Sequence, residues 1–171
     1  MTQLIEGKDY EVKDNFFDSN YFEEMVKIVT NERDTLVDWH FNSKLNDHHT
    51  QEDTEFYFHH IFFLHEPWAR GYDFFRPLWD LFKMKSLMRI KANCYPSKEN
   101  LVVHSPHTDM DFSHKGAIIS LNTCDGYTLL EDGTKIESVA NRVLFFDPGK
   151  LHSSTNCTNA KARFNINVNY F

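Results

Sequence analysis

The second half of the chain is built from short apolar segments separated by turn residues, a pattern typical of β-rich folds. Glu131, Asp132 and Gly133 form a strong hairpin signal, and two further Gly-containing pairs, 125–126 and 148–149, mark turns. We expect strands over residues 88–94, 117–122, 127–130, 135–138, 142–146 and 164–170. These short strands predict a sandwich or barrel of the jelly-roll type, with helices packed outside it.

The first half shows helical periodicity. Apolar residues recur at helical spacing over residues 20–31, where Ser19 is the expected cap and Glu23 and Glu24 would lie in the first turn. A second helix is expected over 72–85, and the aromatic stretch 55–64 favours a strand. The chain is therefore interpreted as one mainly β domain (α+β), with helical support and outer strands in 1–86 and the β core in 87–171.

Composition narrows the function classes. The chain has 171 residues, enough for one core, and its net charge of -7 argues against a nucleic-acid partner. The three cysteines include no CxxC pair and favour reduced thiols. The first residues lack a basic start followed by an apolar run, and no apolar stretch is long enough to span a membrane, so we expect a soluble, cytoplasmic protein.

His107 and Asp109 stand two positions apart, so on an extended segment their side chains project to the same side. His152 follows after an expected strand and turn. Two imidazoles and one carboxylate on one face of an iron ion leave three positions open, as non-haem iron(II) oxygenases require. We expect these three residues to be metal ligands. The alternative is a surface loop, since a lone His-x-Asp arises often by chance.

The chain contains ten histidines, but the others are weaker candidates. His48 and His49 lie in a polar stretch that favours a solvated loop, and adjacent His59 and His60 would point to opposite faces of a strand. His65 belongs to the same aromatic stretch as these two, and the remaining three have no neighbour in the sequence that singles them out: His40, His104 and His114.

Arg163 lies in the last expected strand, eleven positions after His152. A buried guanidinium there would offer a planar fork to a carboxylate, such as the distal end of 2-oxoglutarate. The alternative is an edge-strand charge in water.

In order and approximate spacing, these motifs resemble those of 2-oxoglutarate- and Fe(II)-dependent oxygenases, especially the prolyl 4-hydroxylase-like branch and its short phage forms. The resemblance covers about residues 89–171. The matching elements are the segment 91–96 (Lys-Ala-Asn-Cys-Tyr-Pro), His107-Thr108-Asp109, the hairpin region 126–148, His152 and Arg163-Phe164-Asn165.

This resemblance implies a double-stranded β-helix that holds Fe(II) with His107, Asp109 and His152. It also implies 2-oxoglutarate as cosubstrate, its C5 carboxylate paired with Arg163 and a hydrogen bond from Tyr95, together with O2 and, optionally, ascorbate. The implied reaction couples oxidative decarboxylation of 2-oxoglutarate to succinate with hydroxylation of a substrate, a peptide such as a peptidyl proline or a small molecule.

The chain departs from its relatives at two positions. Ser120 precedes Leu-Asn where they carry Tyr, and Asn165 stands where a Ser is often found, so another 2-oxo acid is conceivable. Whether Asn93, Ser120, Thr128 or Arg142 contacts the cosubstrate is left open. Three apolar strand residues are candidates for the pocket wall, with ordinary core packing as the alternative: Ile118, Leu144 and Ile166.

Two other readings remain. One is a cupin-type metal-binding isomerase or sugar-binding module, which would draw more histidines to the metal and would not need Arg163. The other is a catalytically inactive interaction module on the same fold.

Overall fold

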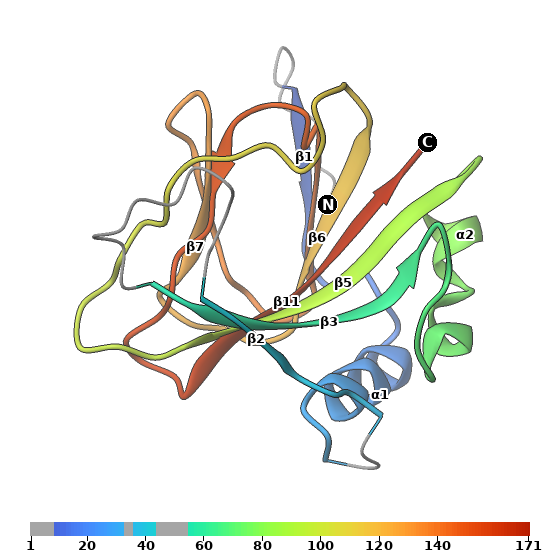
Figure 1. Cartoon of the computed structure of the whole chain (residues 1–171), viewed down its shortest axis with the longest axis horizontal. Helices are drawn as coiled ribbons and strands as arrows, with labels where there is room; N and C mark the ends of the chain where they lie inside the picture. Colours follow the sequence, from blue (N-terminus) through green and yellow to red (C-terminus); the bar gives the residue numbers. More distant parts are fainter. Residues whose placement is uncertain (1–8, 33–35, 44–54) are drawn as a thin grey trace.

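The computed structural model describes residues 9–32, 36–43 and 55–171. Two sheets and a few short helices make up this part of the chain (Figure 1). In chain order the elements are β1 (Tyr10–Lys13), α1 (Ser19–Val29), β2 (His40–Asn42), β3 (Tyr57–Leu64), β4 (Glu66–Pro67), a 3-10 turn (Tyr72–Phe75), α2 (Leu78–Leu81), β5 (Leu87–Pro96), β6 (Lys115–Ser120), β7 (Tyr127–Leu130), β8 (Lys135–Glu137), β9 (Arg142–Phe146), β10 (His152–Ser153) and β11 (Ala162–Tyr170).

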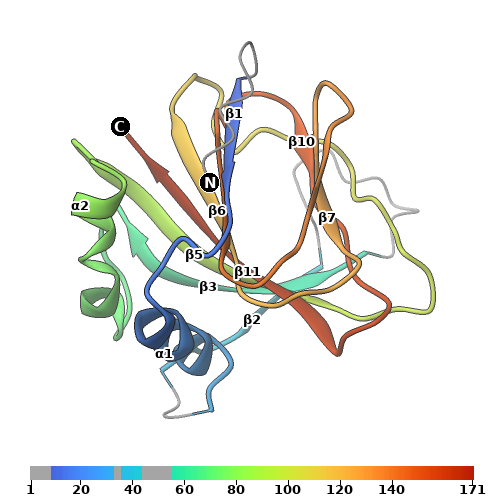
Figure 2. The ribbon, with the colours of Figure 1, turned by 180° about the vertical axis from the view of Figure 1, so that it is seen from behind.

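The larger sheet is antiparallel and has the strand order β1-β9-β6-β11-β5-β3-β2, with β4 attached to β3. The smaller sheet has the order β10-β7-β8. In Figures 1 and 2, β7 stands across from β3, β5 and β11, while α1 and α2 lie on the other side of these three strands. The prediction of a mainly β fold with helices outside the sheets is confirmed.

The two faces of the larger sheet differ in polarity, as β11 illustrates. Because successive side chains point to opposite faces, Ile166 and Val168 join the apolar core, whereas Asn165, Asn167 and Asn169 face the smaller sheet. The core therefore lies between the larger sheet and the helices, and the polar face is left for a site. The largest fully buried apolar side chains of this core are Phe62, Phe75, Met25, Leu78, Ile90, Ile119, Ile166, Val29, Val143 and Val168.

The first helix differs from the prediction at its start. Asp18, not Ser19, is the N-cap, because its carboxylate accepts hydrogen bonds from the backbone N–H groups of Asn20 and Tyr21. With the helix beginning at Ser19, Glu23 and Glu24 fall beyond the first turn. The expected helix end at residue 31 also shortens to Val29.

The single helix expected over 72–85 is wrong. Pro77 lacks an N–H group to continue the ladder, so the segment splits into the 3-10 turn and the four-residue α2. The backbone N–H of Arg76 donates to the carbonyl of Asp73, which is a hydrogen bond of the tighter 3-10 type. The segment leaves helical geometry at Lys83, which has a left-handed φ of 52°.

The six expected strands all form, two of them with the expected bounds and the others shifted by one or two residues at their ends. Gly133 turns the β7–β8 hairpin with φ 82°, which confirms that signal. The strand expected over 55–64 appears as β3, whereas β1, the edge strand beside β9, was not expected. No helix among the described residues is long and apolar enough to cross a membrane.

Asn141 ties the N-terminal part to β9. Its backbone is left-handed, with φ 62°, and its side chain exchanges two hydrogen bonds of 2.9 Å with the backbone of Phe17. We expect Asn141→Gly, which tolerates this φ, to lower the free energy of unfolding by about 1 to 3 kcal/mol. Asn141→Ala should cost about 1 kcal/mol more, because it adds backbone strain. Urea unfolding of both variants measures the difference, and equal stabilities would contradict the strain argument.

Candidate active site

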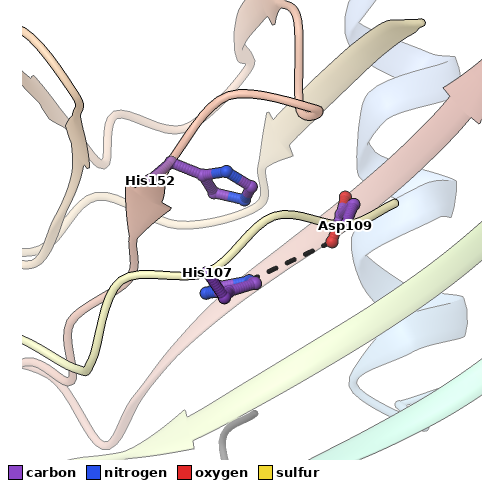
Figure 3. A group of neighbouring side chains, drawn as sticks. All are labelled: His107, Asp109 and His152. Atoms are coloured by element: carbon purple, nitrogen blue, oxygen red, sulfur yellow. Dashed lines mark ion pairs between the residues drawn. The ribbon is translucent and has the colours of Figure 1, made fainter. Parts of the chain in front are cut away.

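The structure brings His107, Asp109 and His152 together (Figure 3). His107 and His152 form an antiparallel bridge in which each donates its backbone N–H to the carbonyl of the other, at 2.9 and 3.0 Å. The Asp109 N–H donates to the carbonyl of Pro148, which fixes the next turn of the loop. As a result, one potential ligand atom from each of the three side chains lies within 4.8 Å of the others.

Both histidines are in the form that binds a metal. His152 Nδ1 lies 3.0 Å from the carbonyl oxygen of Lys150, which can only accept, so Nδ1 carries the proton and Nε2 has its lone pair free. That Nε2 is buried without a hydrogen-bond partner. Burial lowers the pKa of His152, and burial together with the neighbouring His152 ring lowers the pKa of His107 to about 4. Both rings are therefore neutral at pH 7, as ligation requires.

Asp109 is held by a network that the sequence analysis did not single out. One carboxylate oxygen is 2.7 Å from an Arg89 guanidinium nitrogen, and the other accepts a 2.9 Å hydrogen bond from the Asn169 amide. Arg89 Nε also donates to Asn169 Oδ1, closing the ring of three residues. Burial alone would raise the pKa of Asp109, but the Arg89 and Lys91 cations hold it well below its usual range. The carboxylate is thus ionised and oriented before any metal binds.

His114 supports this network, although no neighbour in the sequence singled it out. Its Nδ1 donates to the carbonyl of Phe112, which leaves Nε2 to accept the second amide hydrogen of Asn169. Arg89 and Asn169 are directly opposite one another in the β5–β11 pair. The alternating asparagines of β11 were the signal that could have indicated a polar, functional face.

Arg163 is buried, with 1% of its surface exposed. It lies on β11 between β5 and β6, so the alternative of an edge-strand charge in water is wrong. Its guanidinium donates to the Thr128 hydroxyl at 2.9 Å and the Thr155 carbonyl at 3.2 Å, while Nε has no partner. No carboxylate pairs with it in the described ranges. A buried cation without an anion is the natural receptor for a ligand carboxylate.

Tyr95 lies against Arg163 and lines the same pocket as two of the candidate ligands. Its ring lies under the guanidinium at 5.8 Å, and burial raises the pKa of its hydroxyl to about 12, so it stays protonated and able to donate. Tyr95 and Thr128 line a pocket that also reaches His107 and His152. The complete lining is Tyr57, Lys91, Tyr95, His107, Ile118, Thr128, His152, Ser153, Ser154, Asn165 and Asn167.

The structure shows which of the positions that the sequence left open reach the pocket. Thr128 lines the pocket and binds Arg163. Asn93 and Ser120 are buried but do not line the pocket, and the Asn93 amide donates instead to Asn165. Arg142 does not line it either and pairs with Asp14 on the surface.

Of the three proposed wall residues, Ile118 lines the pocket. Leu144 pairs directly with Ile118 in the neighbouring strand, and so shares its face without lining the pocket. Ile166 is in the core on the opposite face of the sheet, so for this residue ordinary core packing is confirmed and the pocket-wall role is excluded. The alternation of β11 explains this, because Asn165 and Asn167 take the pocket side.

The remaining histidines form no second cluster with metal-binding geometry among the described residues. His59 lies against the ring of the facing histidine of β2, whereas His60 contacts a backbone carbonyl, so the two point apart as expected. His104 is buried against a serine hydroxyl. His48 and His49 lie outside the described residues.

Lys91 adds a cation to the pocket. Its ammonium lies 5.4 Å from the ring centre of Tyr57. Burial, followed by the Arg89 charge, lowers the pKa of Lys91 to about 8, so most molecules carry a charged ammonium there at pH 7.

No protein-family model matches the chain, and no curated protein matches it in sequence. Solved structures match it by fold. A prolyl hydroxylase of Trichoplax adhaerens, in complex with a peptide fragment of the hypoxia inducible factor oxygen degradation domain, has a TM-score of 0.70 and 17% identity, covering 96% of this chain and 84% of its own. A 2OG-Fe(II) oxygenase family oxidoreductase of Burkholderia pseudomallei has a TM-score of 0.69 and 11% identity, covering 95% and 84%.

A viral collagen prolyl hydroxylase from Paramecium Bursaria Chlorella virus-1, solved as its 2OG complex, matches with a TM-score of 0.57 and 14% identity over 97% of both chains. The structural neighbours are 2-oxoglutarate- and Fe(II)-dependent oxygenases, mostly prolyl hydroxylases. The fold expected from the sequence, the double-stranded β-helix, is confirmed, and the buried His-Asp-His group fits the iron triad of such enzymes.

Proposed function

We propose that this protein is a 2-oxoglutarate- and Fe(II)-dependent dioxygenase. The reaction consumes one 2-oxoglutarate and one O2, and yields succinate, CO2 and a substrate in which a C–H bond has become C–OH. One oxygen atom enters succinate and the other enters the product. The observation that carries the proposal is the His-Asp-His group, two neutral imidazoles with one ionised carboxylate, beside a buried arginine that has no anion among the described residues.

In this proposal His107, Asp109 and His152 hold the iron, and Arg163 pairs with the C5 carboxylate of 2-oxoglutarate. Bound iron would supply the activation of O2 and the redox chemistry. The protein's own residues do the rest: Tyr95 donates a hydrogen bond to the cosubstrate, and Arg89 and Asn169 keep the Asp109 carboxylate aimed at the metal.

A peptidyl proline is the first substrate class to test, since prolyl hydroxylases are prominent among the structural neighbours. A small-molecule substrate is the alternative. The cupin-type and inactive-module readings gain no support: among the described residues no further histidine joins the candidate metal group, and the three candidate ligands are intact. The cytoplasmic location expected from the sequence remains a proposal.

The test is succinate release from 2-oxoglutarate under air, with and without added Fe(II). We expect slow, iron-dependent succinate formation in the absence of a substrate, and its loss in His152→Ala. His40→Ala is the matched control, because His40 is exposed and does not line the pocket, and it should keep the activity.

If no succinate forms, titration of Mn(II) and 2-oxoglutarate decides the matter. If the wild type binds both and His152→Ala no longer binds Mn(II), the oxygenase proposal stands and the search turns to substrates. Binding of neither by the folded wild type contradicts the proposal and favours a non-catalytic module.

A further inference from the structure

The pocket wall carries a second cation that the function proposed above does not use. Lys91 is on β5, on the same face as Tyr95, and lines the pocket together with His107 and His152. It has no ion-pair partner in the part of the chain that the structure describes. The Asp109 carboxylate contributes to the field at Lys91, but it is already paired with Arg89.

The charges on this face do not balance. Arg89, Lys91 and Arg163 bring three basic side chains to it, whereas Asp109 is the acidic side chain paired there, with Arg89. Two cations are therefore left without an anion, in a protein whose net charge is -7. Because burying an unpaired charge is costly, such an excess is typical of a site that receives anionic groups.

The two unpaired cations enter the pocket from different points of the β5–β11 ladder. Arg163 pairs with Tyr95 across the β5–β11 ladder, and Lys91 is four residues away from Tyr95. At the usual rise of a strand, this separates their backbones by about 13 Å. A ligand with two carboxylates therefore has one cation near each end of the pocket.

Asn167 lies beside this second position and offers an acceptor to the Lys91 ammonium. It is directly opposite Lys91 in the ladder and also lines the pocket, and its Oδ1 is buried without a hydrogen-bond partner. Lys91 and Asn167 therefore form a polar pair at the metal end of the pocket, with Arg163 behind the other end.

We propose that Lys91 forms a second carboxylate subsite, at the metal end of the pocket. This inference rests on the function proposed above and concerns the same site. The carboxylate comes from one of two sources: the C1 carboxylate of 2-oxoglutarate, or a carboxylate of the hydroxylated substrate.

The first experiment measures binding to the Mn(II)-loaded full chain by calorimetry, in wild type and Lys91→Met. The ligands are 2-oxoglutarate and 4-oxopentanoate, which keeps the ketone and the distal carboxylate but has a methyl group in place of C1 carboxylate. If Lys91 binds the C1 carboxylate, its replacement should weaken the affinity for 2-oxoglutarate by about 10- to 100-fold. The affinity for 4-oxopentanoate should stay nearly unchanged. Lys91→Arg should recover part of the loss.

Lys85→Met is the control, because Lys85 is exposed and does not line the pocket. It should leave the affinity for both ligands unchanged. Lys91→Met should still fold and bind Mn(II), because Arg89 remains paired with Asp109, and titrations at saturating Mn(II) separate loss of the subsite from loss of the metal centre.

The second experiment tests whether Lys91 binds a carboxylate of the hydroxylated substrate. If Lys91→Met binds 2-oxoglutarate as tightly as wild type does, free L-amino acids and their amides are compared as stimulants of succinate release. Stimulation by a free acid but not its amide, lost in Lys91→Met, assigns the subsite to the substrate. If the variant matches wild type in both experiments, the subsite is refuted while the oxygenase stands. A wild type that binds neither Mn(II) nor 2-oxoglutarate refutes both.

Discussion

Replacing Arg163 with methionine should abolish tight binding of 2-oxoglutarate without weakening the fold. Removal of one partner of a buried, hydrogen-bonded charge pair costs about 2 kcal/mol or more, so the affinity should fall by about 30-fold or more. In the ligand-free protein the same guanidinium is a buried cation with neutral partners only, Thr128 and the Thr155 carbonyl. Methionine gives up these two bonds but also removes the desolvated charge.

The free energy of unfolding of Arg163→Met should therefore be unchanged or higher by about 1 to 4 kcal/mol. Urea unfolding and calorimetry with 2-oxoglutarate measure the two effects. In wild type, saturating 2-oxoglutarate should also raise the melting temperature, and in Arg163→Met it should not.

Arg142→Met is the matched control. Arg142 is paired with Asp14 at the surface and does not line the pocket, so this variant should bind 2-oxoglutarate like wild type. Unaltered affinity in Arg163→Met would show that the carboxylate is bound elsewhere. A large loss of stability would show that Arg163 has a structural role.

Replacing Asp109 with alanine should remove metal binding and also destabilise the protein. Loss of a residue that merely supports a ligand costs up to about 100-fold in metal affinity, so loss of the ligand itself should exceed this. In addition, the variant leaves Arg89, whose side chain is 14% exposed, without its anion. Breaking such a buried pair costs about 3 to 5 kcal/mol.

The double variant Arg89→Met/Asp109→Ala separates the two effects. It removes the stranded cation, so it should recover much of the lost stability while Mn(II) binding stays absent. His152→Ala is a useful comparison, since it removes a neutral ligand and should lose the metal with a smaller loss of stability. If Asp109→Ala still binds Mn(II) with wild-type affinity, the ligand assignment is wrong. If the double variant is no more stable than Asp109→Ala, the pairing with Arg89 contributes little.

The sequence determined the β-rich half of the fold and the candidate ligands. Strands such as β7 and β9 were found with their observed bounds, because short apolar runs between turn residues depend on local preferences. His107 and Asp109 were recognisable as a pair because a two-residue spacing on extended backbone puts side chains on one side. His152 and Arg163 were added as the further ligand and the carboxylate partner that such a site needs, and the family resemblance then gave the same roles.

Tertiary structure decided what local patterns could not. The helix expected over 72–85 is interrupted at Pro77, because the missing backbone donor outweighs the apolar periodicity. Ile166 and its neighbours in β11 could not be assigned to faces until the sheet was known, because alternation gives two faces without saying which one meets the core.

The contacts around the candidate metal ligands also depended on the fold. Arg89 and Asn169 are eighty residues apart in the chain, and only the β5–β11 register brings both to Asp109. The lack of an ion-pair partner for Lys91 also became visible only in the structure, because pairing depends on which residues the fold places nearby. Side-chain chemistry and local spacing can be read along the chain, whereas burial and pairing arise from strand order, which long-range packing sets.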